Sequence, residues 1–146
     1  IRENIYNLIK KKYKNVRFPS IVDPTAKISN YSKIGKGNMI MARTFIGANS
    51  KITDFCIVNN NVSIDHDCIL NKFSSLAPAV VIGGNVLMGK KIYIGIGSVI
   101  KNNIVIDSDT LIGASSYLNK NTEKSSVYYG VPAKFIRKIS IKDKNL

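Results

Sequence analysis

In residues 76–100, LAPAVVIGGNVLMGKKIYIGIGSVI, every sixth residue is a medium-sized apolar one, beginning with Leu76. The same phase holds without a slip from Val22 to Leu118. The members between these ends are Ile28, Ile34, Ile40, Ile46, Ile52, Val58, Ile64, Leu70, Leu76, Ile82, Met88, Ile94, Ile100, Ile106 and Ile112. A helix repeats every 3.6 residues and a strand every 2, so neither requires a strict period of six. A coil of short flat strands separated by turns does require it, and the sequence therefore predicts a repeat architecture.

Two further positions of the six-residue repeat support this prediction. If the apolar residue is the first, the fifth is mostly small or β-branched and leaves room for the core. The second position suits a turn because it is often a small polar residue or a glycine, as at Gly35, Gly47, Gly83, Gly89, Gly95 and Gly113. Three repeats, eighteen residues, would close one triangular coil, and coils would stack at about 4.8 Å, the spacing of paired strands. We expect a prism with an aliphatic core and three flat parallel sheets.

The segments on either side of the repeat read differently. Residues 2–13 are predicted to form a helix, because apolar side chains recur there at helical spacing among lysines. Residues 119–146 break the six-residue pattern. We therefore divide the chain into a helix and linker at 1–21, a repeat domain at 22–118 and a short C-terminal tail at 119–146.

The composition limits the classes of function. No apolar run approaches the length of a membrane span, and the two cysteines, Cys56 and Cys68, are expected to be buried free thiols in a reducing cytoplasm. The net charge is +13, but neither an aromatic-basic platform nor a recognition-helix pattern accompanies the lysines, which argues against nucleic-acid binding. A solvated basic surface is the favoured interpretation. Attraction of small polyanions, such as a coenzyme or a nucleotide-sugar, is the alternative.

The single histidine of the chain, His66, lies in the segment Ile64-Asp65-His66-Asp67-Cys68. It follows an inward aliphatic residue by two places, so the repeat predicts an outward position near a corner. An imidazole beside a carboxylate can act as a general base, and the carboxylate raises its basicity. An ordinary exposed turn histidine is the alternative, and the period alone does not separate the two.

The stacking of coils favours the functional interpretation of His66. Eighteen residues further along stands Gly84, so the next coil presents no side chain beside the imidazole and leaves an open shelf. Counting in steps of eighteen residues at another corner gives a second column of stacked residues. The residues after the first are small or apolar, so this column suits a groove for an extended arm. Its members are Asn60, Pro78, Ile96 and Ala114.

These features resemble the hexapeptide-repeat acyltransferases. The closer resemblance is to the sialic acid O-acetyltransferase group, which includes bacterial N-acetyltransferases of UDP-linked 4-amino sugars. The histidine segment at 64–68 resembles that group's histidine followed by an acid, and residues 76–78 and 83–86 resemble its following coil. Gly130-Val131-Pro132-Ala133-Lys134 resembles its C-terminal Gly-x-Pro-Ala ending, and residues 18–26 resemble its link into the helix of strands.

The resemblance implies an all-β fold, a left-handed parallel β-helix, that assembles as a homotrimer with sites between subunits. It implies a cytoplasmic acetyltransferase that uses acetyl-CoA as co-substrate and holds no metal. The most specific implication is acetylation of the 4-amino group of a nucleotide-linked amino sugar in surface-glycan biosynthesis. Residues 1–21 would then be a remnant of an N-terminal nucleotide-binding domain.

The resemblance also implies roles for individual residues. His66 would take the proton from the acceptor, Asp67 would raise the basicity of His66, and Asn59 would lie beside the acceptor. Many members carry a second histidine at the position of Ser75, so this chain departs from the pattern there. The residues implied to border acetyl-CoA are Ser75, Gly84, Ile96 and Ala114.

Two other functions remain open from the sequence. One is O-acetylation of sialic acid or of another sugar hydroxyl, because the sequence does not distinguish an amine from a hydroxyl acceptor. The other is a non-catalytic β-helix scaffold, which would release no thiol from acetyl-CoA. A metal-dependent enzyme of similar coil, such as a carbonic anhydrase, is set aside because one histidine cannot supply its cluster of ligands.

Overall fold

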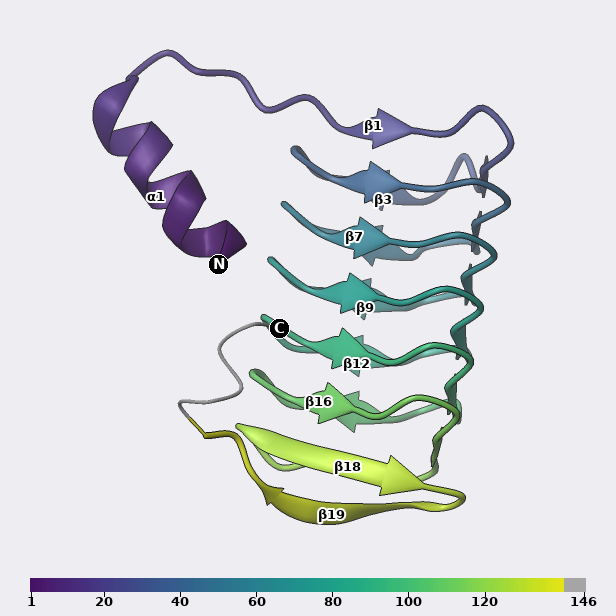
Figure 1. Ribbon diagram of the computed structural model, residues 1–146. Helices are drawn as coiled ribbons and strands as arrows, with labels where there is room; N and C mark the ends of the chain where they lie inside the picture. Colours follow the sequence, from purple (N-terminus) through teal and green to yellow (C-terminus); the bar gives the residue numbers. More distant parts are fainter. Residues whose placement is uncertain (141–146) are drawn as a thin grey trace.

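The computed structural model describes residues 1–140 as a three-sided prism of short parallel strands with a helix beside it (Figure 1). Residues 141–146, the end of the predicted tail, lie outside the described part. The predicted helix is present as α1 (Arg2–Lys12), and an extended linker leads from it to one end of the prism. The parallel β-helix of hexapeptide repeats is thus confirmed, whereas its left-handedness and the domain division at 21/22 and 118/119 stay predictions.

Each face of the prism is one parallel sheet, built from every third strand. Sheet A runs in the order β1 (Ile21–Val22), β4 (Met39–Ile40), β7 (Ile57–Val58), β10 (Ser75–Leu76), β13 (Tyr93–Ile94), β16 (Leu111–Ile112), β18 (Ser126–Gly130) and β19 (Ala133–Lys138). Sheet B runs β17 (Tyr117–Leu118), β14 (Val99–Ile100), β11 (Val81–Ile82), β8 (Ser63–Ile64), β5 (Phe45–Ile46) and β2 (Lys27–Ile28). Sheet C runs β15 (Val105–Ile106), β12 (Leu87–Met88), β9 (Ile69–Leu70), β6 (Lys51–Ile52) and β3 (Lys33–Ile34).

The register of the strands confirms a coil of eighteen residues. Ser75 pairs with Tyr93 in sheet A, and Ile82 pairs with Ile100 in sheet B, each a step of eighteen along the chain. Residues eighteen apart therefore lie in adjacent coils of the stack. This relation places every side chain discussed below.

The aliphatic series forms the core, as predicted. Its members from Ile40 to Leu118 are 0–1% exposed. The first three are not fully buried, and Val22 is 42% exposed, because no coil precedes them to cover that end of the prism. The two cysteines are buried and free, in agreement with their place in the small-residue position.

The turn residues differ from the prediction. The left-handed backbone occurs at the fourth position of each repeat, with φ between 53° and 66° from Gly37 to Ser115, and not at the second position. Glycines of the second position serve close packing between coils. A Cβ on Gly95 would lie 2.5 Å from the backbone nitrogen of Ala114 in the next coil, a separation that real Cβ atoms do not show.

An aromatic cluster attaches α1 to the corner between sheets C and A. Phe55 and Phe73 stack with ring centroids 5.3 Å apart, and Tyr6 of α1 packs against both of them. The N-terminal segment of the same chain, including Phe18, covers this pair, and both rings are half-buried.

The opposite end of the prism is closed by the hairpin of β18 and β19 (Figure 1). β18 pairs in parallel with β16 and therefore continues sheet A, and Tyr128 joins the core. β19 returns antiparallel to β18 and is mostly exposed. Among residues 1–140, no helix is long and apolar enough to span a membrane.

Candidate functional site

His66 lies in the turn between β8 and β9, at the corner where sheets B and C meet. Its side chain is 58% exposed, which confirms the outward position expected from the repeat. Two carboxylates hold the residue in place. The backbone N–H of His66 donates to Oδ1 of Asp65 at 2.8 Å, and Nδ1 of the imidazole lies 2.7 Å from Oδ2 of Asp67.

The hydrogen bond to Asp67 determines which ring nitrogen is free. An ionised carboxylate can only accept hydrogen bonds, so Nδ1 carries the proton and Nε2 presents its lone pair when the ring is neutral. The hydrogen bond that His66 donates to Asp67 and the charge of Asp65 raise the pKa of His66 above its ordinary value. The same contact lowers the pKa of Asp67. The pair has the geometry of an oriented general base.

Gly84 lies directly against the free nitrogen. A Cβ at this position would lie 2.6 Å from Nε2 of His66. The sequence predicted an empty shelf here, and this is wrong in one respect, because the edge of the imidazole occupies the space that the missing side chain leaves. Gly84 therefore permits the ring to lie over the next coil.

The backbone N–H of Gly84 has no hydrogen-bond partner within residues 1–140. At this position of three other repeats the side chain of the preceding residue accepts from the backbone amide. The backbone N–H of Asn60, for example, donates to the side chain of Asn59. Gly83 has no side chain to accept, and Gly84 is buried beneath the edge of the imidazole, so its amide is unpaired among the described residues.

The sequence interpretation missed Asn49, which the structure places beside Asp67. Asn49 contributes, after His66, to lowering the pKa of the Asp67 carboxylate. Asn49 precedes Asp67 by eighteen residues, so the coil period applied backwards from the histidine segment would have found it.

Three of the other predicted site residues lie at a different corner. Asn59, Ile96 and Ala114 follow strands of sheet A, at the corner where sheets A and B meet. Ile96 is 53% exposed and Ala114 is also exposed. Strand β8 separates Asn59 from His66 along the chain, so one subunit does not bring this group together with the candidate base.

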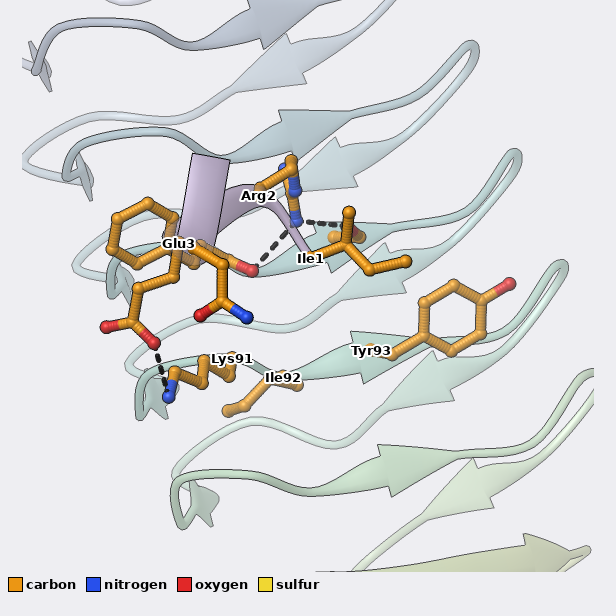
Figure 2. A pocket seen from close by; sticks show the side chains of 9 residues that line it. Ile1, Arg2, Glu3, Lys91, Ile92 and Tyr93 are labelled. Carbon is orange, nitrogen blue, oxygen red and sulfur yellow. Dashed lines mark hydrogen bonds and ion pairs between the residues drawn. The ribbon is translucent and has the colours of Figure 1, made fainter. Parts of the chain in front are cut away.

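Ser75 lies on the face of sheet A, away from both corners. Its Oγ accepts a hydrogen bond of 2.6 Å from the guanidinium of Arg2, at the start of α1. Beside this contact is a cavity of about 170 Å³, and Figure 2 shows Arg2, Glu3, Lys91 and Tyr93 around it. Lys91 forms an ion pair with Glu3 there. The hydroxyl of Ser75 therefore already has a partner from its own chain.

Metal-binding groups are not part of this arrangement. Within the described residues, no three histidine, cysteine, aspartate or glutamate side chains lie close enough together to hold an ion. The pKa of Cys56 is raised to about 11, chiefly by burial, and that of Cys68 is also raised by burial. Neither thiol has the character of a nucleophile.

The chain matches no protein-family model, but individual proteins resemble it. It is 33% identical over 115 residues to the serine acetyltransferase of Buchnera aphidicola subsp. Schizaphis graminum, which covers 79% of this chain and 41% of that protein. The chain therefore spans less than half the length of this curated relative.

Solved structures of sugar N-acetyltransferases share the fold. PerB from Caulobacter crescentus, in complex with CoA and GDP-perosamine, superimposes with a TM-score of 0.84 and 28% identity, over 92% of this chain and 66% of that chain. The acetyltransferase domain of PglB from Neisseria gonorrhoeae, in complex with acetyl coenzyme A, superimposes with a TM-score of 0.85 and 27% identity. That match covers 91% of this chain and 66% of the domain.

Proposed function

We propose that this chain, which is related to the hexapeptide-repeat sugar N-acetyltransferases, transfers the acetyl group of acetyl-CoA to the amino group of a nucleotide-linked amino sugar. The observation that carries the proposal is the oriented imidazole of His66, with Nδ1 bonded to Asp67 and Nε2 open beside Gly84. The relatives supply the substrate class, because a solved structure of one holds CoA and GDP-perosamine. A 4-amino sugar destined for surface glycans is the specific acceptor that we infer.

The reaction would proceed by direct attack. The acceptor nitrogen attacks the thioester carbonyl while Nε2 of His66 removes its proton, and the carbon–sulfur bond then breaks to release CoA as the thiol. The unpaired N–H of Gly84, which is buried beneath the imidazole, would donate to the oxygen on which negative charge develops only after the ring moves aside. No acyl-enzyme is required, since Cys68 is buried and its pKa is raised.

A site shared between subunits of a homotrimer would join the two separated groups of residues. His66 and Asp67 would come from one subunit, and the column of Asn59, Ile96 and Ala114 from its neighbour. Apolar side chains on both faces beside the His66 corner supply surface for such contact. Those exposed by 36–47% are Phe45, Ile69, Val81, Leu87, Val99 and Val105.

Acetyl-CoA, the proposed acetyl donor, and the two free cysteine thiols together suit a reducing compartment such as the cytoplasm. Gly84, Ile96 and Ala114 would contact the coenzyme arm through backbone groups. Ser75 would reach it only on exchanging its bond with Arg2, so its role in coenzyme binding is the least supported of the four.

A hydroxyl acceptor is the second candidate. It is favoured by the 33% identity to a protein named serine acetyltransferase. A base that deprotonates an amine during attack can equally deprotonate a hydroxyl, so the geometry of His66 suits both reactions. The acceptor is therefore decided by groups around the base and not by the base itself.

Thiol release from acetyl-CoA tests these candidates. The acceptor panel would contain GDP-perosamine, UDP- and dTDP-linked 4-amino sugars, CMP-linked and free sialic acid, and serine, each with the native protein and with His66→Ala. Release with amino sugars alone, lost in the variant, supports the proposal. Release only with a hydroxyl acceptor moves the assignment to O-acetylation. If no thiol is released and acetyl-CoA does not bind, the non-catalytic scaffold is the remaining candidate function.

A further inference from the structure

Sheet C presents two different surfaces along its length. The side chains that point outward from its strands are, in coil order, Lys33, Lys51, Ile69, Leu87 and Val105. The last three are apolar and belong to the surface proposed above for subunit contact, whereas the first two are exposed lysines. The basic part of sheet C therefore lies in the two coils that precede the coil of His66.

A groove of about 360 Å³ lies over this basic part of the sheet. Three lysines line it, Lys33, Lys51 and Lys72, together with one acidic side chain, Asp54. The carboxylate of Asp54 is already engaged, because it lies 3.0 Å from Nζ of Lys72 and accepts the backbone N–H of Lys36 at 3.2 Å. The charge that remains in the groove is therefore that of Lys33 and Lys51.

Lys33 and Lys51 are direct neighbours across the parallel strands β3 and β6. Among residues 1–140, neither side chain forms an ion pair or a hydrogen bond. Adjacent strands lie only about 4.8 Å apart, so the two positive charges repel each other. An anionic ligand would remove this repulsion, because it supplies the counter-charge that the described part of the chain does not.

The groove and the proposed coenzyme residue Gly84 lie on opposite sides of the candidate base. Lys51 pairs with Ile69, which follows His66 by three residues, so the Cα atoms of Lys51 and His66 are about 10 Å apart by strand rise and spacing. Nε2 of His66 faces away from the groove, toward Gly84 in the next coil. A lysine side chain, one phosphate and one sugar ring can span the distance from Lys51 to the base.

We propose that Lys33 and Lys51 bind the diphosphate of the nucleotide-linked acceptor and so direct its sugar toward His66. This rests on the proposed function, which supplies a nucleotide-sugar as the acceptor. A diphosphate fits because its two phosphates offer separate anionic oxygens to two adjacent ammonium groups. CoA also contains a diphosphate, but the residues proposed to border the coenzyme arm beside the base lie in later coils than the groove.

Binding of nucleoside diphosphates tests this assignment without any reaction. GDP and UDP would be titrated calorimetrically into the protein in the presence of saturating CoA, so that the coenzyme site cannot take up the probe. The groove variant is the double change Lys33→Gln and Lys51→Gln. Lys120→Gln with Lys124→Gln is the matched control, because these exposed lysines lie between β17 and β18, at the opposite end of the prism, and remove the same two charges.

We expect the native protein to bind both nucleotides, and to bind them more weakly as salt is raised, because exposed charges are screened. The groove variant should lose on the order of tenfold in affinity for both, while the control should bind as the native protein does. With a reactive acceptor, KM for the acceptor should rise in the groove variant and KM for acetyl-CoA should stay unchanged. Without ligand, the groove variant should melt at or above the native temperature, because one repulsive pair is gone.

The outcomes separate this assignment from the proposed function. A loss of nucleotide affinity confined to the groove variant supports it, even where no acceptor on the panel reacts. No nucleotide binding by the native protein, or equal affinities in the native protein and the groove variant, would overturn it even where His66→Ala abolishes acetyl transfer. Equal losses in the groove variant and the control would overturn it as a general effect of charge. A loss of affinity for CoA alone would place the donor in the groove and also overturn it.

Discussion

At the residue scale, the proposed chemistry of this chain depends on one imidazole. Replacing His66 with alanine should lower turnover by about two to four decades, the usual contribution of a positioned general base. The fold should be unaffected, because the side chain is 58% exposed and its hydrogen bond is to Asp67 alone. Steady-state kinetics and a thermal melt of the same preparation check both expectations. Turnover near the native value would contradict the assignment of His66 as the base.

The pH dependence of the reaction follows from the raised pKa of His66. A general base acts in its neutral form, so kcat/KM should rise with pH and level off above a midpoint higher than 6.5. Asp67→Asn removes the charge that stabilises the imidazolium, so its midpoint should lie lower. A pH–rate profile of both proteins measures the difference. A midpoint that moves upward in Asp67→Asn would refute the role of Asp67.

The same shift has a consequence for stability with a definite sign. A pKa that is higher in the folded than in the unfolded protein favours folding while the imidazole is protonated. This contribution is present below the unfolded value of about 6.5 and is lost as the pH rises through the folded pKa. The stability contribution of His66 therefore falls as the pH rises, whereas kcat/KM rises. Activity and this part of the stability cannot be maximal at the same pH.

At the scale of the elements, the contact between adjacent coils decides where the imidazole lies. Gly84→Ala would place a Cβ 2.6 Å from Nε2, so the ring must move, and kcat should fall by about one to two decades. Gly97→Ala is the control, because the nearest atom to its added Cβ is Oγ of Ser115 at 3.8 Å. Ala79 shows that alanine adopts the same left-handed backbone in this prism. Native kcat in Gly84→Ala would show that the ring is not required in its observed position.

A second prediction at the scale of the elements concerns how α1 is attached to the prism. Arg2 donates to the backbone oxygens of Phe55, Phe73 and Ser74 and to the hydroxyl of Ser75. Removing this charged donor in Arg2→Ala should weaken the docking of α1 by about 1.5–3 kcal/mol, the range for hydrogen bonds to charged groups. Hydrogen exchange should then quicken in residues 2–12 and stay unchanged in the coils.

Lys11→Ala serves as the comparison for this experiment, because Lys11 is an exposed residue of the last turn of α1. If exchange in α1 were as slow in Arg2→Ala as in Lys11→Ala, the aromatic cluster of Tyr6, Phe18, Phe55 and Phe73 alone would hold the helix.

At the scale of the whole molecule, the proposed site is divided between two corners, so it would need a second copy of the chain. Two inactive variants, His66→Ala and Ala114→Trp, should restore activity when unfolded together and refolded. With random mixing in a trimer, about a quarter of the native activity should return, because about three quarters of the trimers are mixed and each of these contains one intact site of three. Sedimentation equilibrium gives the stoichiometry. No recovery from correctly assembled mixed trimers would mean that each site lies within a single subunit.

Sequence and structure agree wherever a side chain's position follows from the six-residue period. The burial of Ile64 and Leu70, the outward position of His66 and the inward position of Cys68 all follow from counting along one chain, because a strict repeat alternates the environment in a fixed way. The eighteen-residue step likewise predicts that Gly84 lies beside His66, as the structure has it.

Tertiary structure alone decided what the period does not encode. The contact between the Asp67 carboxylate and Nδ1 of His66 depends on side-chain torsions, which a repeat leaves free. The covering of Phe55 and Phe73 depends on α1, whose docking has no periodic relation to the coils. The left-handed residue at the fourth position reflects how the turn closes a corner in three dimensions. The sequence by itself thus determined the prism and the outward histidine, because local period dictates inside and outside, whereas the orientation of the base is a matter of contacts between coils.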